Sequence, residues 1–219
     1  MAVEEITVYL DSARDPVANL KREAELFNMV DERSHPECVR FWANSRCLVR
    51  GPARSSKHGW YNEELAKELE IPVIERTTGG GVVYHDEGNL NWSFFLRTSG
   101  SFQSPRASFD RASKIIIGAL DRLGIHARFS PPNRIDVSDR KVSGMAARST
   151  VRTLLVHGTL LLRSDLKTLN QLCIPPPDCP PVSNLCEWKP GIDSESVVRA
   201  VIDVLEGSGF RVRTVESGS

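Results

Sequence analysis

The run Arg76-Thr77-Thr78-Gly79-Gly80-Gly81-Val82-Val83-Tyr84-His85-Asp86 is the most informative stretch of the chain. Three consecutive glycines carry no Cβ, so the backbone can approach a ligand closely. Successive N–H groups in such a turn can form an anion-binding nest. Arg76 adds a planar fork that suits a phosphate or carboxylate. The pattern is neither a Walker loop nor a Rossmann fingerprint, and a glycine triplet between strands is also typical of a bulge or tight turn.

The sequence around this run predicts an α+β domain. Residues 73–97 alternate β-branched and aromatic residues with Gly, Asn and Asp, which is typical of paired strands joined by turns. Further strands are expected at 6–10, 38–43, 47–50, 135–137, 141–147, 154–162 and 210–212. Helices are expected from Pro16, with Asp15 as N-cap, and at 62–69, 107–123, 165–172 and 194–206. Because strands arrive in runs with helices between them, we expect one domain with a mixed sheet.

Composition excludes several classes of protein. The 219 residues contain 28 Lys+Arg and 28 Asp+Glu, and this zero net charge argues against a dedicated nucleic-acid binder. Apolar runs are too short to span a membrane, and Met1 to Glu5 form no signal core, so we expect a cytoplasmic protein with no membrane partner. Five cysteines, with no CxxC pair, predict free thiols rather than disulfides or zinc ligands.

Three further segments contain candidate site residues. Asn89 follows the turn at His85-Asp86, and it either caps the hairpin or points at a bound nucleotide. Lys141 begins a strand with small residues at Gly144 and Ala146, an arrangement that leaves room for a ligand beside the ammonium; a lone lysine is more often a solvated surface charge. His157 interrupts an apolar strand, which also fits a core histidine or a bulge. The loop 174–190 contains six prolines, and long loops of this kind are often functional.

Together and in this order, these segments resemble the lipoate–protein ligase family, which shares its fold with biotin–protein ligases. The resemblance rests on Arg76 to Asn89, on Lys141 to Ala146 and on His157 to Leu161. It extends upstream to Asp15-Pro16, Asn19-Leu20, Glu23 and Phe41-Trp42-x-Asn44, and downstream to Val182–Leu185 and Pro190–Ile192. It therefore covers nearly the whole chain, and it implies a largely antiparallel mixed sheet flanked by helices.

The resemblance also implies an ATP-dependent ligase with two steps. Lipoate or octanoate attacks the α-phosphate of ATP in the presence of Mg²⁺ and gives acyl-AMP, and a lysine of a lipoyl-carrier protein then takes the acyl group. Lys141 matches the catalytic lysine that contacts the carboxylate and the phosphate. The carrier is a 2-oxoacid dehydrogenase subunit, a glycine-cleavage carrier or a similar lipoyl protein. The residues that match the ATP and adenylate segment are Arg76, Gly79, Gly80, Gly81, Val82, Val83, Tyr84, Asn89 and Lys141, and those that match the acyl pocket are Trp42, His85, Gly144, Ala146 and His157.

The sequence departs from the family pattern in two places. Arg134 follows Asn133 where the family usually has an acid, and Asp136, two residues on, is the candidate metal ligand that replaces it. The chain also ends soon after its last helix, so we expect residues 1–219 to form a catalytic domain without the C-terminal accessory domain. Some family members receive that part as a separate subunit.

Two other functions remain open. One is an octanoyltransferase of the same fold, which moves an acyl group from acyl carrier protein through a cysteine. Cys173 and Cys179 are the candidate nucleophiles, because no cysteine lies between Cys47 and Cys173. The other is a non-catalytic module that binds acyl groups or the carrier, which Arg134 favours and Lys141 opposes. Biotin ligation fits less well, because the Arg-Thr-Thr-Gly-Gly-Gly form resembles the lipoate side of the family.

Overall fold

Eight strands form the main sheet, in the order β11-β1-β2-β6-β10-β9-β8-β7. The computed structural model describes residues 4–52, 60–98 and 105–217. β1 is parallel to both β2 and β11, and each other neighbouring pair is antiparallel. The expected mixed, largely antiparallel sheet is therefore confirmed. The strands are β1 (Glu5–Asp11), β2 (Cys38–Trp42), β6 (Asn89–Arg97), β7 (Ala127–Ser130), β8 (Arg134–Val137), β9 (Arg140–Ser149), β10 (Thr153–Leu161) and β11 (Arg211–Ser217).

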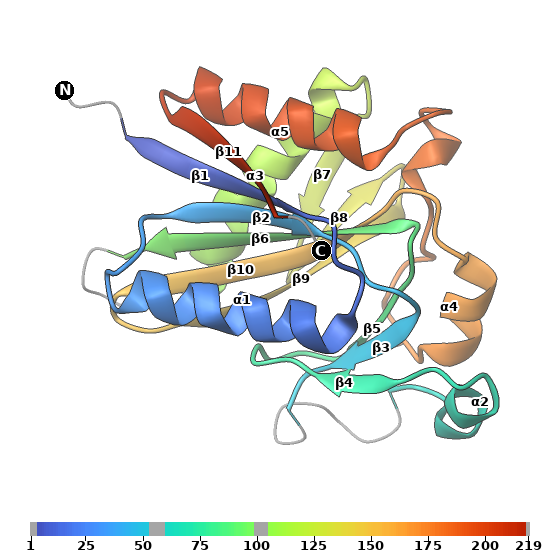
Figure 1. Cartoon of the computed structure of the whole chain (residues 1–219). Coiled ribbons are helices and arrows are strands. Elements are labelled where there is room, and N and C mark those ends of the chain that lie inside the picture. The colour runs from blue at the N-terminus through green and yellow to red at the C-terminus, as the bar shows by residue number, and fades with distance from the viewer. Residues whose placement is uncertain (1–3, 53–59, 99–104, 218–219) are drawn as a thin grey trace.

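A second, three-stranded sheet contains the segment that follows the glycine triplet. Its order is β4-β3-β5, with β3 (Cys47–Arg50) parallel to β4 (Val73–Glu75) and antiparallel to β5 (Val82–His85). Figure 1 shows this small sheet below one end of the main sheet, beside the short helices α2 (Glu63–Glu68) and α4 (Leu166–Leu172).

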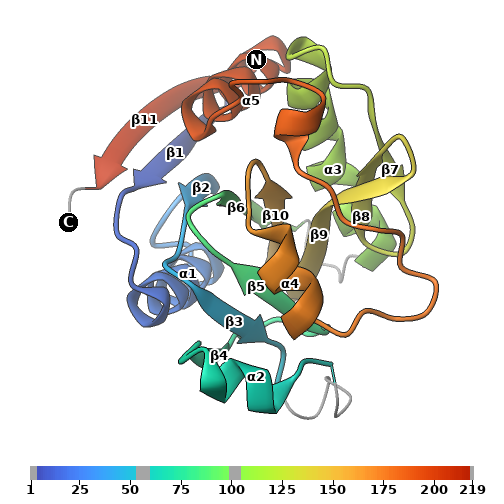
Figure 2. The ribbon, with the colours of Figure 1, turned by 90° about the vertical axis from the view of Figure 1, so that its right-hand side faces the viewer.

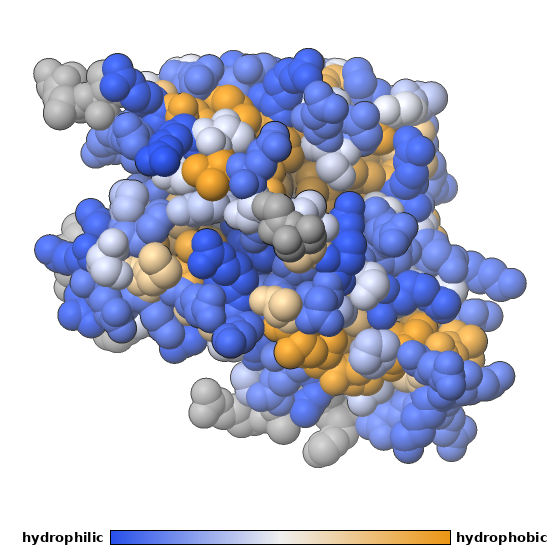
Figure 3. Space-filling model, in the orientation of Figure 1, coloured by the Kyte–Doolittle hydropathy of each residue, from blue (hydrophilic) through white to orange (hydrophobic). Residues whose placement is uncertain are grey.

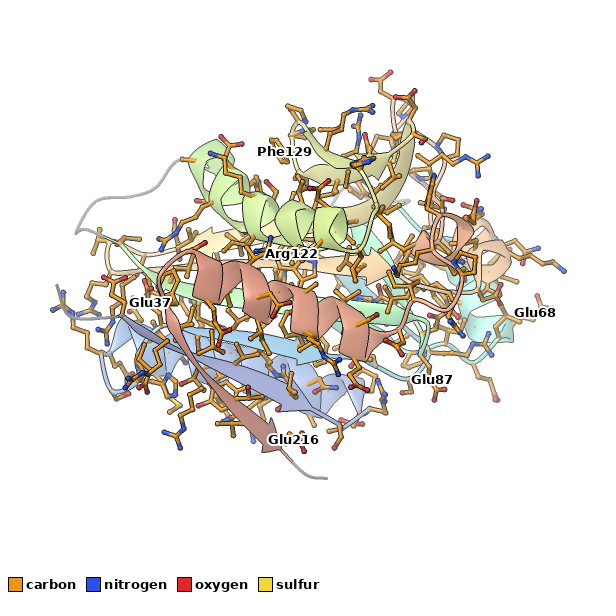
Figure 4. All side chains as sticks on the ribbon, turned by 90° about the horizontal axis from the view of Figure 1, so that it is seen from above. Glu37, Glu68, Glu87, Arg122, Phe129 and Glu216 are labelled. Atoms are coloured by element: carbon orange, nitrogen blue, oxygen red, sulfur yellow. The ribbon has the colours of Figure 1, made fainter. Side chains whose placement is uncertain are left out.

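Three longer helices cover the main sheet. α1 (Pro16–Asp31) lies on one face, against β6 and β10 (Figure 1). α3 (Pro105–Arg122) and α5 (Ser194–Gly207) pack side by side on the opposite face, as the view from above shows (Figure 4). Their apolar stripes meet the inward side chains of the sheet in the main core, where Trp92, Phe94, Ile116 and Leu120 are fully buried.

Local signals set the helix ends as the sequence predicts. Asp15 accepts a hydrogen bond from Ala18 N at 2.6 Å, which satisfies one orphan N–H group of α1, and Pro16, the first helical residue, has no N–H to satisfy. Gly124 has φ +79° directly after α3, the left-handed conformation that ends a helix.

Four features differ from the sequence prediction. β7 was missed because its four residues lie at a sheet edge and are only partly buried, which leaves little alternating pattern to read. A 3₁₀ helix, η1 (Leu185–Glu187), interrupts the predicted Pro-rich loop, β11 extends beyond the predicted residue 212, and the strands separate into two sheets.

In the part of the chain that the structure describes, no helix has the length and apolarity needed to cross a membrane.

Candidate active site

A cavity of about 720 Å³ brings most of the predicted site residues together. Its walls are the glycine loop with β5, residues 141–146 of β9, residues 157–161 of β10, and the loop after α4. Figure 2 views the molecule from this side. The predicted residues that line it are Trp42, Arg76, Gly80, Gly81, Val82, Val83, Tyr84, His85, Lys141, Gly144, Ala146 and His157. Gly79, Asn89 and Asp136 are not lining residues. Asn89 is buried behind the wall and donates to Oδ1 of Asn91, which does line the cavity.

Arg76 is engaged with its own loop rather than free to meet a ligand. Its Nε donates to Thr78 Oγ1 at 3.0 Å, and its Nη1 donates to Val49 O at 3.0 Å. Its Nη2 donates to the carbonyl oxygens of Gly79 at 3.0 Å and Gly81 at 2.9 Å. Burial lowers the pKa of Arg76 to about 10, so the group stays charged at neutral pH. In this conformation Arg76 shapes the glycine loop, with Gly80 at φ +101°.

A buried chain of hydrogen bonds joins this loop to α1. His157 Nε2 lies 2.7 Å from Thr78 Oγ1, and its Nδ1 lies 2.9 and 3.0 Å from the carboxylate oxygens of Glu23. Ser93 donates to Glu23 at 2.6 Å and accepts from Trp42 Nε1 at 3.1 Å. Burial alone would raise the pKa of Glu23, but the charge and hydrogen bond of His157 outweigh it and hold that pKa below its usual value. Glu23 is therefore an anion enclosed by donors.

His85 lies next to this chain but is neutral. Burial is the main cause that lowers its pKa to about 3, with help from the charges of Arg76 and His157. Its Nδ1 lies 3.1 Å from Asn44 Nδ2, a geometry in which the amide donates and the ring nitrogen accepts. The ring meets Trp42 edge to face, with centroids 6.0 Å apart. His85 therefore contributes a neutral polar wall to the cavity.

Lys141 offers a cation to a ligand in the cavity. Its backbone is fixed to the Pro-rich loop, because Lys141 N donates to Pro181 O at 2.9 Å and Ser183 N donates to Lys141 O at 3.0 Å. Among the described residues no carboxylate forms an ion pair with its ammonium. A Cβ on Gly144 would lie 3.3 Å from Nζ, so the missing side chain leaves the ammonium room at the cavity wall. An unpaired ammonium beside a cavity favours an anionic ligand.

The predicted metal ligand is engaged elsewhere. Asp136 Oδ2 accepts from Arg134 Nε at 3.0 Å, and the carboxylate is 1% exposed, which leaves Oδ1 buried without a partner. In the described ranges no three His, Cys, Asp or Glu side chains are grouped as a metal site. Mg²⁺ prefers carboxylate, phosphate and water oxygens in octahedral geometry. The pairing with Arg134 does not fit such a site, and the metal role of Asp136 stays a prediction.

Both candidate nucleophilic cysteines line the cavity. Burial raises the pKa of Cys173 to about 11, although the nearby charge of Lys141 opposes the shift. A thiol with this pKa is almost wholly protonated at neutral pH, and the thiolate is the reactive form. Cys179 lies on the adjoining loop.

An apolar cluster forms one end of the cavity. Leu20, Trp42, Cys47 and Val49 are buried there, with Ile74 and Val83 packed against them. On the surface, Figure 3 shows further apolar side chains gathered around the small sheet. The cavity therefore combines an apolar end with a cation and a glycine loop, which suits an amphiphilic carboxylate.

Sequence reasoning missed two positions of the candidate site and underrated a third. No separate role was predicted for Thr78 within the glycine run, although its hydroxyl links Arg76 to His157. Trp60 lines the cavity but matched no motif. Glu23 entered only through the resemblance; its spacing of three from Leu20 and Leu26 on the buried face of α1 was the available signal.

A family model decides the classification, because the lipoyl protein ligase A/B catalytic domain matches residues 15–206. The chain belongs to this family. It is 31% identical over 212 residues to a lipoate-protein ligase A of Psychrobacter cryohalolentis, covering 90% of this chain and 59% of that protein. It is 30% identical to a lipoate-protein ligase A of Bdellovibrio bacteriovorus, covering 98% of this chain and 65% of that protein. The chain thus spans less than two thirds of the length of these two relatives.

Solved structures of ligases of this kind share the fold. The bi-partite lipoate protein ligase of Thermoplasma acidophilum superposes with a TM-score of 0.80 at 21% identity, covering 98% of this chain and 88% of that one. A P. falciparum protein in complex with lipoate gives 0.79 at 25% identity, covering 96% of this chain and 66% of that one. The fold expected from the resemblance is therefore confirmed.

Proposed function

We propose that this chain is the catalytic part of a lipoate–protein ligase, which activates lipoate or octanoate with ATP and transfers the acyl group to a carrier lysine. The observation that carries the proposal is that Lys141, unpaired by any described carboxylate, lines the same cavity as the Gly80–Gly81 loop and the apolar cluster around Trp42. The relatives named lipoate-protein ligase support the same activity.

Different residues bind the acyl chain, the carboxylate and the phosphates. The apolar cluster receives the acyl chain, and the carboxylate reaches Lys141 at the polar end of the cavity. The carboxylate oxygen attacks the α-phosphate of ATP, which forms acyl-AMP and releases pyrophosphate. Lys141 stabilises the negative charge that the two groups bring together, and backbone N–H groups of the glycine loop donate to phosphate oxygens. A carrier lysine amine then attacks the acyl carbon, and AMP leaves.

The proposed chemistry requires an acceptor protein, and the partners named next are also proposals. The acceptor is a lysine on a lipoyl-carrier domain, and the Thermoplasma acidophilum ligase has been studied together with its E2 lipoyl domain. A separate accessory subunit is a further proposed partner, because that ligase is described as bi-partite. Mg²⁺ is a further proposed cofactor, which would accompany the ATP phosphates.

One observation favours the octanoyltransferase alternative, since Cys173 and Cys179 both line the cavity. The raised pKa of Cys173 opposes it, because an acyl-transfer nucleophile needs a thiolate or an adjacent base. We therefore place the ligase first.

The decisive assay incubates a lipoyl-carrier domain with this protein, ATP, Mg²⁺ and either lipoate or octanoate. Intact mass spectrometry should show a carrier that has gained one acyl group, and a carrier without its acceptor lysine should gain none. Replacing ATP and free acid by octanoyl acyl carrier protein tests the alternative directly. Acylation only from the thioester would reject the ligase in favour of the transferase.

A further inference from the structure

Trp60 makes the closest side-chain approach to the glycine loop among the described glycine contacts. A Cβ built on Gly81 would lie 1.6 Å from Cζ3 and 1.7 Å from Cε3 of the Trp60 indole. Since real Cβ atoms do not come within 3.0 Å of such neighbours, only glycine at position 81 allows the indole to rest on the backbone there. The Cε3–Cζ3 edge of the ring thus lies against the loop that the proposed function assigns to phosphates.

The backbone of Trp60 is fixed to the opposite wall of the cavity. Ile174 N donates to Trp60 O at 2.8 Å, and Tyr61 forms an isolated antiparallel bridge with Cys173. On the loop side, Arg76 Nη2 donates to Gly81 O at 2.9 Å. Gly81 therefore lies between a guanidinium that holds its carbonyl and the Cε3–Cζ3 edge of the indole. The indole links two walls of the cavity and is only half-buried.

The position of Trp60 suits one part of an acyl-adenylate. In that molecule the phosphate separates the acyl chain from the ribose and base. The apolar cluster around Trp42 suits the acyl chain, and Trp60 is not a member of it. With the phosphate between Lys141 and the glycine loop, the base lies on the side away from the acyl chain. Trp60 is an aromatic lining residue whose ring contacts that loop, and stacking on an indole accepts any planar base without a hydrogen-bond code.

We propose that the Trp60 indole, whose edge lies against Gly81, is the platform on which the adenine ring of ATP and of the acyl-adenylate stacks. The proposal rests on the proposed ligase function and names the part of that site which binds the base. The polyphosphate and the acyl chain are bound by other groups, so the contribution of Trp60 is specific to nucleotides.

The test compares a ligand that has a base with one that has none. ATP and inorganic tripolyphosphate are titrated by calorimetry into the unmodified chain, Trp60→Ala and Trp60→Phe. Base stacking on an aromatic residue contributes about 1–3 kcal/mol, so Trp60→Ala should weaken ATP binding by about tenfold or more. Trp60→Phe keeps a smaller ring and should lose only part of this, and tripolyphosphate affinity should change in neither variant.

Fluorescence gives a second readout that does not depend on the alanine variant folding. The chain has four tryptophans, and stacking of adenine should quench the emission of Trp60. The ATP-induced quench should be lost in Trp60→Phe and kept in Trp188→Phe, a matched change of a partly buried tryptophan that packs on the main core.

Each remaining outcome overturns the proposal. Unchanged ATP affinity in Trp60→Ala means that the indole only packs against the loop. An equal loss for ATP and tripolyphosphate means that it shapes the phosphate site and does not hold the base. If the unmodified chain binds neither ATP nor tripolyphosphate, the ligase function itself fails, a result distinct from both of these.

Discussion

Glu23 on α1 and His157 on β10 are 134 residues apart in the chain, yet Nδ1 of the imidazole lies 2.9 and 3.0 Å from the two carboxylate oxygens. Through Thr78 and Arg76 the same chain of contacts reaches the glycine loop, and through Ser93 it reaches Trp42. The pair thus fixes both the polar and the apolar ends of the cavity.

Removing one partner of this pair should destabilise the protein more than neutralising it. His157→Ala leaves the Glu23 carboxylate buried with one donor fewer, and breaking such a pair costs about 3–5 kcal/mol. Glu23→Gln retains an acceptor and should cost only about 1–2 kcal/mol. Urea unfolding monitored by circular dichroism measures both. Equal losses in the two variants would show that the charge of Glu23 is not the reason for the cost.

His85 should make stability depend on pH. Its folded pKa, about 3, lies below the ordinary value of 6.5, so the unfolded chain binds the extra proton between these two values. Its contribution is fully present above about pH 6.5 and is lost as the pH falls towards about 3, with a slope of at most about 1.4 kcal/mol per pH unit. Urea unfolding at several pH values in this window should show a smaller slope for His85→Gln. The exposed His126, changed to Gln, serves as the control and should keep the slope of the unmodified chain.

Lys141→Ala should abolish acyl transfer while the fold stays intact. The ammonium is a fixed charge at the reacting groups, and losing such a group costs on the order of a hundredfold or more in rate. The carrier assay measures the loss, with preformed lipoyl-AMP as well as with ATP and lipoate. Lys114→Ala, on the exposed side of α3, should retain full rate. Near-normal transfer by the Lys141 variant from lipoyl-AMP would contradict its assignment.

Neither cavity cysteine should carry the acyl group. The pKa of Cys173, raised to about 11 by burial, keeps its thiol protonated, so Cys173→Ser should remain active. Cys179→Ser should also remain active, because transfer from an acyl-adenylate needs no nucleophile on the protein. Intact mass of the protein caught during turnover should show no adduct. A hydroxylamine-sensitive acyl adduct on either cysteine would instead support the octanoyltransferase.

The Arg134–Asp136 pair should limit the first step more than the second. A carboxylate held by a guanidinium at 3.0 Å is a poor ligand for a hard cation that accompanies ATP. We expect transfer from synthetic lipoyl-AMP to be faster than pyrophosphate release from ATP and lipoate. Arg134→Asp should raise pyrophosphate release and leave transfer unchanged, whereas Arg128→Asp, a change of an exposed arginine on β7, should alter neither. Pyrophosphate release as fast as transfer in the unmodified chain would refute this idea.

The sequence by itself determined the parts of the structure that local chemistry controls. Asp15-Pro16 begins α1 and Gly124 ends α3, because caps and φ preferences act within a few residues. The glycine run and Lys141 were recognisable because several rare patterns occur in a fixed order along the chain. These features depend on neighbours in sequence, and they were predicted with the correct residues.

Only the tertiary structure decided what each polar group contacts. From the sequence, Arg76 was expected to be free to bind a phosphate. In the fold its guanidinium instead donates to carbonyl oxygens of its own loop and to Val49 O in β3. Glu23 is a buried anion because α1 packs against the sheet and brings its carboxylate to His157. Asp136 accepts a hydrogen bond from Arg134, which lies two residues earlier on β8. Trp60 belongs to no sequence pattern, and only the fold places its indole against Gly81. Hydrogen bonds and burial between residues distant in sequence depend on how the sheets and helices pack, and no local spacing records that arrangement.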